Sequence, residues 1–276
     1  MHDELKLLLK KYYEWEGETG ESYREMYFSS QIFGQYEHRF RLRTALKLLA
    51  LKETEKVLDL GCAEGYVTFR LAEKSPHVTG MDISDNKLKK TDEVGKMFKP
   101  VKLPDFVCAD ANERLPFNDN EFDAVLCLET LEHTISPEMV LKEISRILKP
   151  GGRAILSIPT WSQYSWIHVL RNKVNPQNLN RPVLLANQFE QPFEGHIWNF
   201  TLSGFLNQFR EIPLAPRRIK GAISFDLPFF QQLRANKKLQ NITVRIQSIG
   251  DRLMQYIPGN EKYSRYVIVE AFKREV

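Results

Sequence analysis

The sequence predicts an α/β fold built on a doubly wound, mostly parallel sheet, and two observations carry that prediction. Between residues 56 and 159, short β-branched segments alternate with longer segments of helical periodicity. The first strand-like segment, Val57 to Leu60, turns through Gly61 and Gly65 directly into a helix-like run from Tyr66 to Lys74. In sheets of this kind, a turn at the carboxyl end of a strand is where mononucleotide ligands bind.

The composition limits the classes of protein to which this chain can belong. A chain of 276 residues with 42% hydrophobic and 27% charged residues is ordinary for a globular protein, so one main domain with insertions is expected. The net charge of +4 gives little support to a dedicated nucleic-acid binder. Cys62, Cys108 and Cys127 have no Cys-x-x-Cys spacing, which argues against a disulfide framework, a zinc ribbon or an iron–sulfur cluster. We expect reduced thiols on buried strands and turns.

The start of the chain, Met1 to Lys11, is charged and amphipathic, and no run reaches the roughly 18 apolar residues that a membrane span needs. We therefore expect no transmembrane segment and a cytoplasmic location. Two helices are expected before the first strand, Glu4 to Trp15 and Phe33 to Leu51.

The turn after the first strand limits the class of ligand that can bind there. A dinucleotide fold uses Gly-x-Gly-x-x-Gly to hold a pyrophosphate, whereas the spacing here is Gly61-x-x-x-Gly65. The carboxylates of Asp59 and Glu64 would repel a pyrophosphate but suit a ligand with an ammonium or sulfonium charge. S-adenosylmethionine is such a ligand. The alternative is any doubly wound protein with a glycine turn after its first strand.

With these residues the chain resembles the class I S-adenosylmethionine-dependent methyltransferases, in the type 11-like branch that acts on small molecules. Asp59, Gly61 and Gly65 match that family's first motif. The resemblance implies a Rossmann-like, seven-stranded sheet with an antiparallel last strand, an N-terminal helical lid and inserted helical segments. It implies S-adenosylmethionine as cofactor and S-adenosylhomocysteine as product. The cofactor-binding residues it suggests are Asp59, Gly61, Cys62, Gly65, Asp82, Ile83, Asp110, Ala111 and Leu128.

The second strand, His77 to Ile83, carries the acid Asp82, which lies 21 positions after Gly61. An acid at about this offset meets ribose hydroxyls in doubly wound folds. The alternative is that Asp82 or Ser84 caps a helix from Asn86 to Lys96.

The third strand, Asp105 to Ala109, ends on Asp110 and Ala111, where the family contacts adenine. A short acidic side chain can accept a hydrogen bond from the exocyclic amine of that ring. The segment 115–123 resembles the family's approach to its fourth strand, here Ala124 to Leu128.

The fourth strand leads into Glu129-Thr130-Leu131-Glu132-His133. The Asn/Asp-Pro-Pro-aromatic motif of enzymes that methylate base amines or glutamine amides is absent, and Cys127 is expected to be an inert packing thiol. The ending resembles enzymes acting on quinones, sterols, sugars and other metabolites. His133 is a candidate general base, and its alternative role is to hold the loop by hydrogen bonds.

The rest of the chain is assigned more coarsely. A helix from Ser136 to Leu148, a tight turn at Pro150-Gly151-Gly152 and a strand from Arg153 to Ile158 complete the part that resembles the family well. The expected domains are a lid at 1–40, a cofactor-binding core at 41–160, a substrate-side insertion at 161–200 and the remaining sheet at 201–276. Within the last part we expect a helix at Thr201 to Glu211, strands at Arg217 to Phe225 and Tyr266 to Phe272, and a helical arm at about 228–256.

The stretch from Glu190 to Trp198 combines two carboxylates, an imidazole and two large rings in a loop shaped by Pro192 and Gly195. It is the expected wall of an acceptor pocket, with His196 as the second candidate catalytic residue. The alternative is that His196 closes this loop onto the core.

The function these observations favour is methyl transfer to an oxygen or nitrogen of a small-molecule acceptor, through positioning of donor and nucleophile and without a metal. A general base is needed only for a hydroxyl acceptor. Two other hypotheses stay open: a non-catalytic scaffold that binds the cofactor, and an RNA methyltransferase, which the mild charge disfavours. No strong nucleic-acid signal is present.

Nicotinamide dinucleotides are predicted not to bind, because the third glycine of the dinucleotide motif is missing from the turn at Gly61 and Gly65. Differential scanning fluorimetry with NAD and with S-adenosylmethionine checks this. A thermal shift with NAD as large as that with S-adenosylmethionine would contradict the cofactor assignment.

Overall fold

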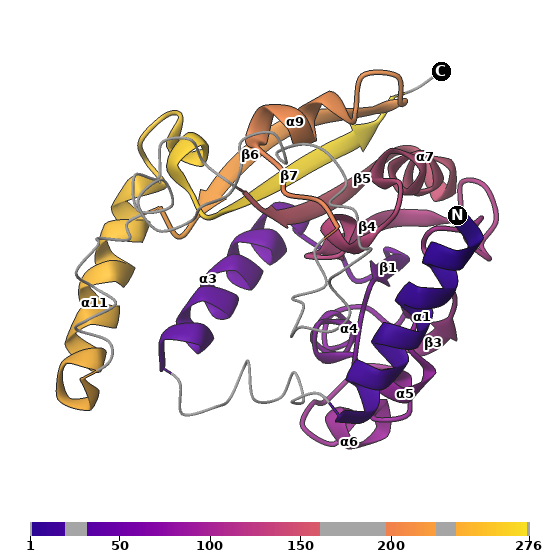
Figure 1. The fold of residues 1–276 in the computed structure, drawn as a ribbon, viewed down its shortest axis with the longest axis horizontal. Helices are drawn as coiled ribbons and strands as arrows, with labels where there is room; N and C mark the ends of the chain where they lie inside the picture. The colour runs from indigo at the N-terminus through magenta and orange to yellow at the C-terminus, as the bar shows by residue number, and fades with distance from the viewer. Residues whose placement is uncertain (1, 20–31, 161–196, 225–235, 275–276) are drawn as a thin grey trace.

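A computed structural model describes residues 2–19, 32–160, 197–224 and 236–274. A seven-stranded sheet with the order β3-β2-β1-β4-β5-β7-β6 runs through its centre (Figure 1). Pairs from β3 to β5 are parallel, and β7 is antiparallel to both neighbours, which confirms the predicted Rossmann-like sheet. The strands are β1 Val57–Leu60, β2 Val78–Asp82, β3 Asp105–Cys108, β4 Phe122–Leu128, β5 Leu148–Pro159, β6 Leu214–Ala222 and β7 Tyr266–Lys273.

Helices cover both faces of the sheet, as a doubly wound fold requires. On one face, α7 and α9 pack with the larger hydrophobic cluster, and on the other face α3 and α4 pack with the second cluster. The described helices are α1 His2–Thr19, α3 Ile32–Leu49, α4 Tyr66–Ala72, α5 Asp85–Leu88, α6 Thr91–Gly95, α7 Pro137–Ile147, α9 Leu202–Asn207 and α11 Lys237–Met254, with short 3-10 turns η1 Leu131–His133 and η4 Asn260–Tyr263. None of these described helices is long and apolar enough to cross a bilayer.

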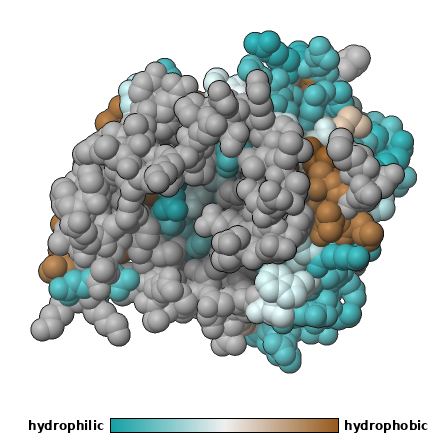
Figure 2. Space-filling view, viewed as in Figure 1, coloured by the Kyte–Doolittle hydropathy of each residue, from teal (hydrophilic) through white to brown (hydrophobic). Residues whose placement is uncertain are grey.

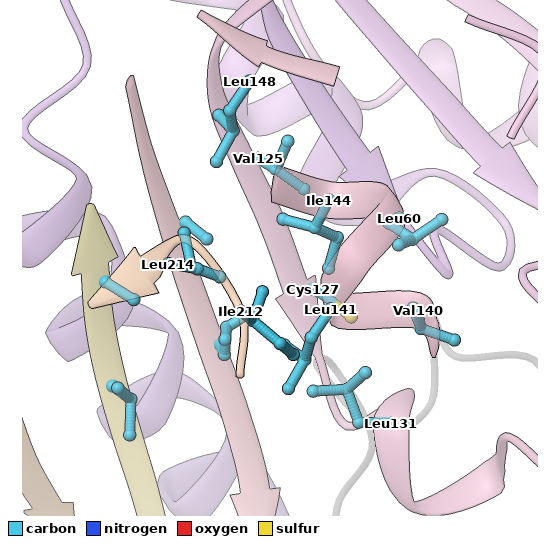
Figure 3. Close-up of a cluster of buried hydrophobic side chains, with 14 of the residues drawn as sticks. Leu60, Val125, Cys127, Leu131, Val140, Leu141, Ile144, Leu148, Ile212 and Leu214 are labelled. Carbon is cyan, nitrogen blue, oxygen red and sulfur yellow. The ribbon is translucent and has the colours of Figure 1, made fainter. Parts of the chain in front are cut away.

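The central strands are apolar because both of their faces are covered. All four residues of β1 are buried, as are most of β4, where Val, Leu and Ala alternate around Cys127. Figure 3 shows Val125 and Cys127 of β4 facing Val140, Leu141 and Ile144 of α7. Cys127 is fully buried and burial raises the pKa of its thiol, which supports its expected role as an inert packing residue.

Two sequence-based assignments in the core are wrong. The helix expected from Asn86 to Lys96 is broken into α5 and α6, where the hydroxyl of Thr91 donates to the carbonyl of Leu88 at 2.7 Å. Such side-chain bonds compete with helical ones. Cys108, expected on a buried strand, is exposed because β3 is the edge strand of the sheet.

The Pro150-Gly151-Gly152 segment is likewise not a tight turn between separate elements. It lies inside β5 as a bulge, since Phe122 pairs with Leu148 and Ala124 pairs with Arg153. Gly151 has a φ of 72°, a conformation that favours glycine. The Lys149 ammonium contacts both carboxylate oxygens of Asp123 at 2.8 Å across the bulge.

Elements in the last part of the chain begin and end at other residues than the sequence predicted. β6 runs over Leu214–Ala222 rather than from Arg217 to Phe225, because Ile223 has a φ of 58° and leaves the strand. Phe225 itself lies outside the described residues, as do positions 161–196 of the expected insertion. Helix α3 continues through residue 40, and its second half packs on the sheet through Ala45, Leu48 and Leu49.

Candidate functional site

The sheet reverses its strand order between β1 and β4, and the turn after β1 lies at the carboxyl edge of that switch point. Gly61 and Gly65 have φ values of 79° and 84°, in the left-handed region. A Cβ at Gly61 would lie 2.2 Å from the Thr130 hydroxyl, and one at Gly65 would lie 2.9 Å from the Phe106 ring. Both glycines of the predicted motif are therefore required by backbone conformation and by space.

Four N–H groups of this turn are already used within the protein. Gly61 and Cys62 donate to the carbonyl of Met81 at 2.8 and 3.0 Å, and Gly65 donates to the carbonyl of Cys62 at 2.9 Å. Ala63 donates to the Asp82 carboxylate at 2.8 Å. A loop that binds pyrophosphate must present these donors to the ligand. This loop instead fits a ligand without a phosphate.

The carboxyl groups of Asp59 and Glu64 act differently from the sequence-based expectation that their charges repel a pyrophosphate. Asp59 is buried and accepts from the Thr68 hydroxyl at 2.6 Å, and burial raises its pKa to about 7. Glu64 is also buried, with its carboxylate 3.6 Å from the Lys90 ammonium. Because both side chains are buried, the exclusion of pyrophosphate rests on the backbone donors instead.

Asp82 ends β2 and is partly buried beside this turn. Its carboxylate accepts from the N–H of Ala63 at 2.8 Å and from the N–H of Ser84 at 3.0 Å. The N-cap of α5 is Ser84, whose hydroxyl accepts from the N–H of Lys87 at 3.3 Å. A carboxylate has about four lone-pair positions, so Asp82 keeps acceptor capacity for ribose hydroxyls. The remaining acceptor capacity of Asp82 thus fits an adenosyl ligand, whose ribose hydroxyls can donate hydrogen bonds.

The other predicted cofactor contacts line the same edge. Asp110 and Ala111 follow β3 and are partly exposed, and Asp110 accepts from the backbone and side-chain amides of Asn112, both at 2.8 Å. Ile83 and Leu128 are partly exposed at the ends of β2 and β4. The thiol of Cys62 is buried, which raises its pKa well above the usual value. The parallel strands bring all of these residues to one edge.

Two carboxyl groups after β4 were not singled out from the sequence. Glu129 has a φ of 53° and accepts from the Ser157 hydroxyl at 2.8 Å, while Arg41 of α3 lies 3.1 Å from its other oxygen. Glu132 is fully buried, and its pKa is raised well above the usual range by burial and by Glu129. The sequence signal that could have identified Glu129 is its position directly after β4, a strand that ends at the edge described above.

His133 lies on η1 with its Nε2 atom 3.8 Å from a carboxyl oxygen of Glu132. Its ring meets Tyr13 of α1 edge-on, with 6.0 Å between ring centroids. His196, the second candidate catalytic residue, lies outside the described residues. Trp198 is held in the core, since its indole donates to the carbonyl of Thr134 at 2.9 Å and stacks on Phe200.

Helix α1 links the two ends of this edge. Glu14, which the sequence did not single out, accepts from the Ser84 hydroxyl at 3.2 Å and from the N–H groups of Asp85 and Asn86 at 3.1 Å. One face of α1 thus binds the start of α5, next to Asp82, while Tyr13 reaches His133. Leu7 and Leu8 of α1 are exposed. Figure 2 shows a hydrophobic area over this helix.

The comparison with known families agrees with this geometry. Residues 58–156 match the family model described as "Methyltransferase domain". The matched part of the chain is therefore similar to a methyltransferase domain. The match begins within β1 and ends within β5, so it contains the glycine turn, Asp82, Asp110 and the turn with His133.

The chain is similar to several curated methyltransferases over this region. It is 32% identical over 115 residues to the ubiquinone biosynthesis O-methyltransferase of Idiomarina loihiensis, which covers 41% of this chain and 46% of the relative. It is 35% identical over 129 residues to the demethylmenaquinone methyltransferase of Staphylococcus carnosus, covering 46% of this chain and 52% of the relative. The chain therefore spans about half the length of the curated relatives it matches.

Solved structures share the fold over most of the chain. Geranyl diphosphate C-methyltransferase from Streptomyces coelicolor, in a complex with S-adenosyl-L-homocysteine, aligns with a TM-score of 0.55 at 18% identity, covering 86% of this chain and 77% of that one. The [4+2]-cyclase SpnF aligns with a TM-score of 0.56 at 18% identity, covering 86% of this chain and 80% of that one. These likenesses concern the fold.

The methyltransferase domain is predicted to lose stability with rising pH through Asp59. Its pKa of about 7 in the folded state lies above the ordinary 3.8, so its contribution to the free energy of unfolding is complete below about pH 4 and is lost as the pH rises through 7. Asp59→Asn removes this dependence. The free energy of unfolding of the variant relative to wild type should rise by on the order of 3–4 kcal/mol from pH 4 to pH 8. Denaturant titrations that give parallel pH profiles would contradict this.

Asp82→Ala is predicted to weaken S-adenosylhomocysteine binding by about 1.5–3 kcal/mol, the range for a hydrogen bond to a charged group. Because the carboxylate also accepts from Ala63 and Ser84, Asp82→Asn is the matched variant that keeps one acceptor oxygen for the loop. Calorimetry measures both. Unchanged affinity in both variants would remove Asp82 from the cofactor site.

Proposed function

We propose that this protein transfers the methyl group of S-adenosylmethionine to an oxygen or nitrogen of a small-molecule acceptor. The observation that carries the proposal is the turn after β1, whose N–H groups are used internally while Asp82 beside it keeps acceptor capacity. This combination fits an adenosyl ligand that lacks phosphates. The relatives named above, two of them quinone-pathway methyltransferases by their names, support the small-molecule acceptor class.

Different residues at the carboxyl edge of the sheet would bind different parts of the cofactor. Asp82 would accept from the ribose hydroxyls, Asp110 and Ala111 would contact the adenine, and Leu128 would supply an apolar contact. The bound cofactor supplies an electrophilic methyl group on a positive sulfur. Helix α1, held through the adjacent residues Tyr13 and Glu14 to His133 and to the start of α5, acts as the lid that shields the edge from water. Rate enhancement then comes mainly from holding donor and acceptor in line.

His133 acts as the general base when the acceptor is a hydroxyl. Its imidazole lies beside Glu132, a buried carboxyl whose raised pKa favours the neutral, protonated form. His133 would accept the proton of a hydroxyl acceptor, and the bound cofactor would supply the methyl group and leave as S-adenosylhomocysteine.

The direct test is turnover with a metabolite panel. Purified protein is incubated with S-adenosylmethionine and with quinones, sterols or sugars bearing free hydroxyls or amines, and S-adenosylhomocysteine release and product mass are measured. Acceptor-dependent release supports the proposal. Cofactor binding without release from any acceptor would favour the scaffold hypothesis, and strong salt-dependent RNA binding with RNA methylation would favour the RNA methyltransferase hypothesis.

His133→Ala is predicted to lower kcat for a hydroxyl acceptor by about 10²–10⁴-fold, the usual contribution of a general base, with little change in S-adenosylhomocysteine affinity. The Trp198→Ala variant is the structural control. It removes the stacking on Phe200 and the bond to Thr134, so it should lower the Tm. Equal losses of Tm in both variants, without a selective loss of kcat in His133→Ala, would make His133 a structural residue.

A further inference from the structure

Helix α11 carries its apolar side chains on the outside. Five large apolar residues follow one another at intervals of three, four, three and four residues, which places them in one stripe along the helix. All of them are between 37% and 62% exposed. We call this the α11 stripe, and it consists of Leu239, Ile242, Ile246, Ile249 and Leu253.

The inner face of the same helix is polar, and contacts fix its orientation. Thr243, Gln247 and Asp251, spaced four residues apart, are buried. The Asp251 carboxylate accepts from the Tyr36 hydroxyl of α3 at 2.8 Å and from the N–H of Ser224 at 2.7 Å. A rotation that buried the stripe would break these bonds and expose the carboxylate of Asp251. The outward direction of the stripe is therefore built into the fold.

Positive charge lies along one side of the stripe. Arg245 and Arg252 are exposed, and their spacing of seven residues places them on the same side of the helix. The one acidic residue between positions 237 and 257 is Asp251, which is already bonded on the inner face. Tyr256 and Ile257, directly after the helix, are 86% and 50% exposed and continue the apolar surface.

A second copy of this chain is a poor match for this surface, although the spacing of the stripe also suits a coiled coil. In a self-pair, Arg245 and Arg252 would flank the seam on one side, and Thr243 and Gly250 would flank it on the other. Thr243 is buried against its own protein, and Gly250 carries no charge. The arginines would find no acid on the partner helix, and in an antiparallel pair they would face each other.

An anionic membrane surface offers negative charges for Arg245 and Arg252, which a second copy of the helix does not. Helices that lie in a membrane interface combine an apolar face with basic flanking residues and aromatic groups near the boundary. We propose that the α11 stripe, with Arg245 and Arg252, docks this protein on the surface of a membrane that contains anionic phospholipids. The helix would lie in the headgroup region without crossing the bilayer. This proposal is independent of the methyl-transfer chemistry.

The position of α11 makes such docking relevant to the site. Its last turns join the carboxyl edge of the sheet, because Ser224 follows β6, and Ala222 pairs with Tyr266, which also pairs with Pro159 at the end of β5. In Figure 1, α3 and α11 project together from that edge, away from α7 and α9. A membrane that contacts the stripe would therefore lie beside the carboxyl edge of the sheet.

The test is flotation of the full chain with vesicles of phosphatidylcholine alone or of phosphatidylcholine with phosphatidylglycerol. Wild type should float with the anionic vesicles, less at high salt. The double variant Ile246→Glu, Ile249→Glu should reduce the bound fraction about tenfold or more, as should Arg245→Gln with Arg252→Gln. Leu103→Glu is the matched control, since Leu103 is 70% exposed in a loop elsewhere, and it should float like wild type.

Circular dichroism and the thermal shift with S-adenosylmethionine verify that each variant is folded. Wild type that fails to float, binds neutral and anionic vesicles equally, or loses no binding in the α11 variants would overturn the proposal. A dimer in light scattering that the Ile246 and Ile249 substitutions dissociate, without vesicle binding, would also overturn it and assign the stripe to a second copy.

Discussion

The absence of a side chain at Gly61 is the constraint on which the arrangement of the site depends. A Cβ there would lie 2.2 Å from the hydroxyl of Thr130, which is itself placed between the carbonyls of Leu60 and Leu128 at 3.2 and 3.3 Å. The same turn donates from Gly61 and Cys62 to Met81. One left-handed residue therefore joins the carboxyl ends of β1, β2 and β4, which are the strands that present Asp82, Leu128 and the turn with His133.

Burial raises the pKa of several acidic residues around this turn. Asp59 and Glu132 lie inside the protein, where the cost of desolvating a charge raises the pKa of each carboxyl. Burial also raises the pKa of Asp82, although the ammonium of Lys87 and the N–H groups of Ser84 and Ala63 oppose that shift, while Glu129 accepts from the Ser157 hydroxyl. The edge thus presents carboxylate oxygens to a ligand, while the carboxyls beneath it carry less negative charge than the sequence suggests.

The fold does not by itself select the reaction. The structural neighbours include a C-methyltransferase and a [4+2]-cyclase, which share the sheet at 18% identity and differ in chemistry. What distinguishes this chain lies in the parts attached to the sheet. Helix α1 contacts both the start of α5 and His133, and helix α11 presents an apolar stripe near the same edge. These attachments are where acceptor choice and location in the cell would be decided.

The sequence by itself determined the sheet and the cofactor turn, because both depend on local signals. The run Val57 to Leu60, the spacing of Gly61 and Gly65, and the acid at Asp82 each follow from backbone conformation and short-range periodicity. Bounds were less secure where a side chain competes with the backbone, as at Thr91, or where a bulge absorbs a turn-like sequence, as at Gly151. Tertiary structure alone decided that Asp59 is buried, that Arg41 meets Glu129 and that Glu14 caps α5, since each joins residues distant in the chain. It also decided which face of α11 points outward, because the partners of Asp251 come from Tyr36 and Ser224, and helical periodicity cannot show which side a distant residue will cover.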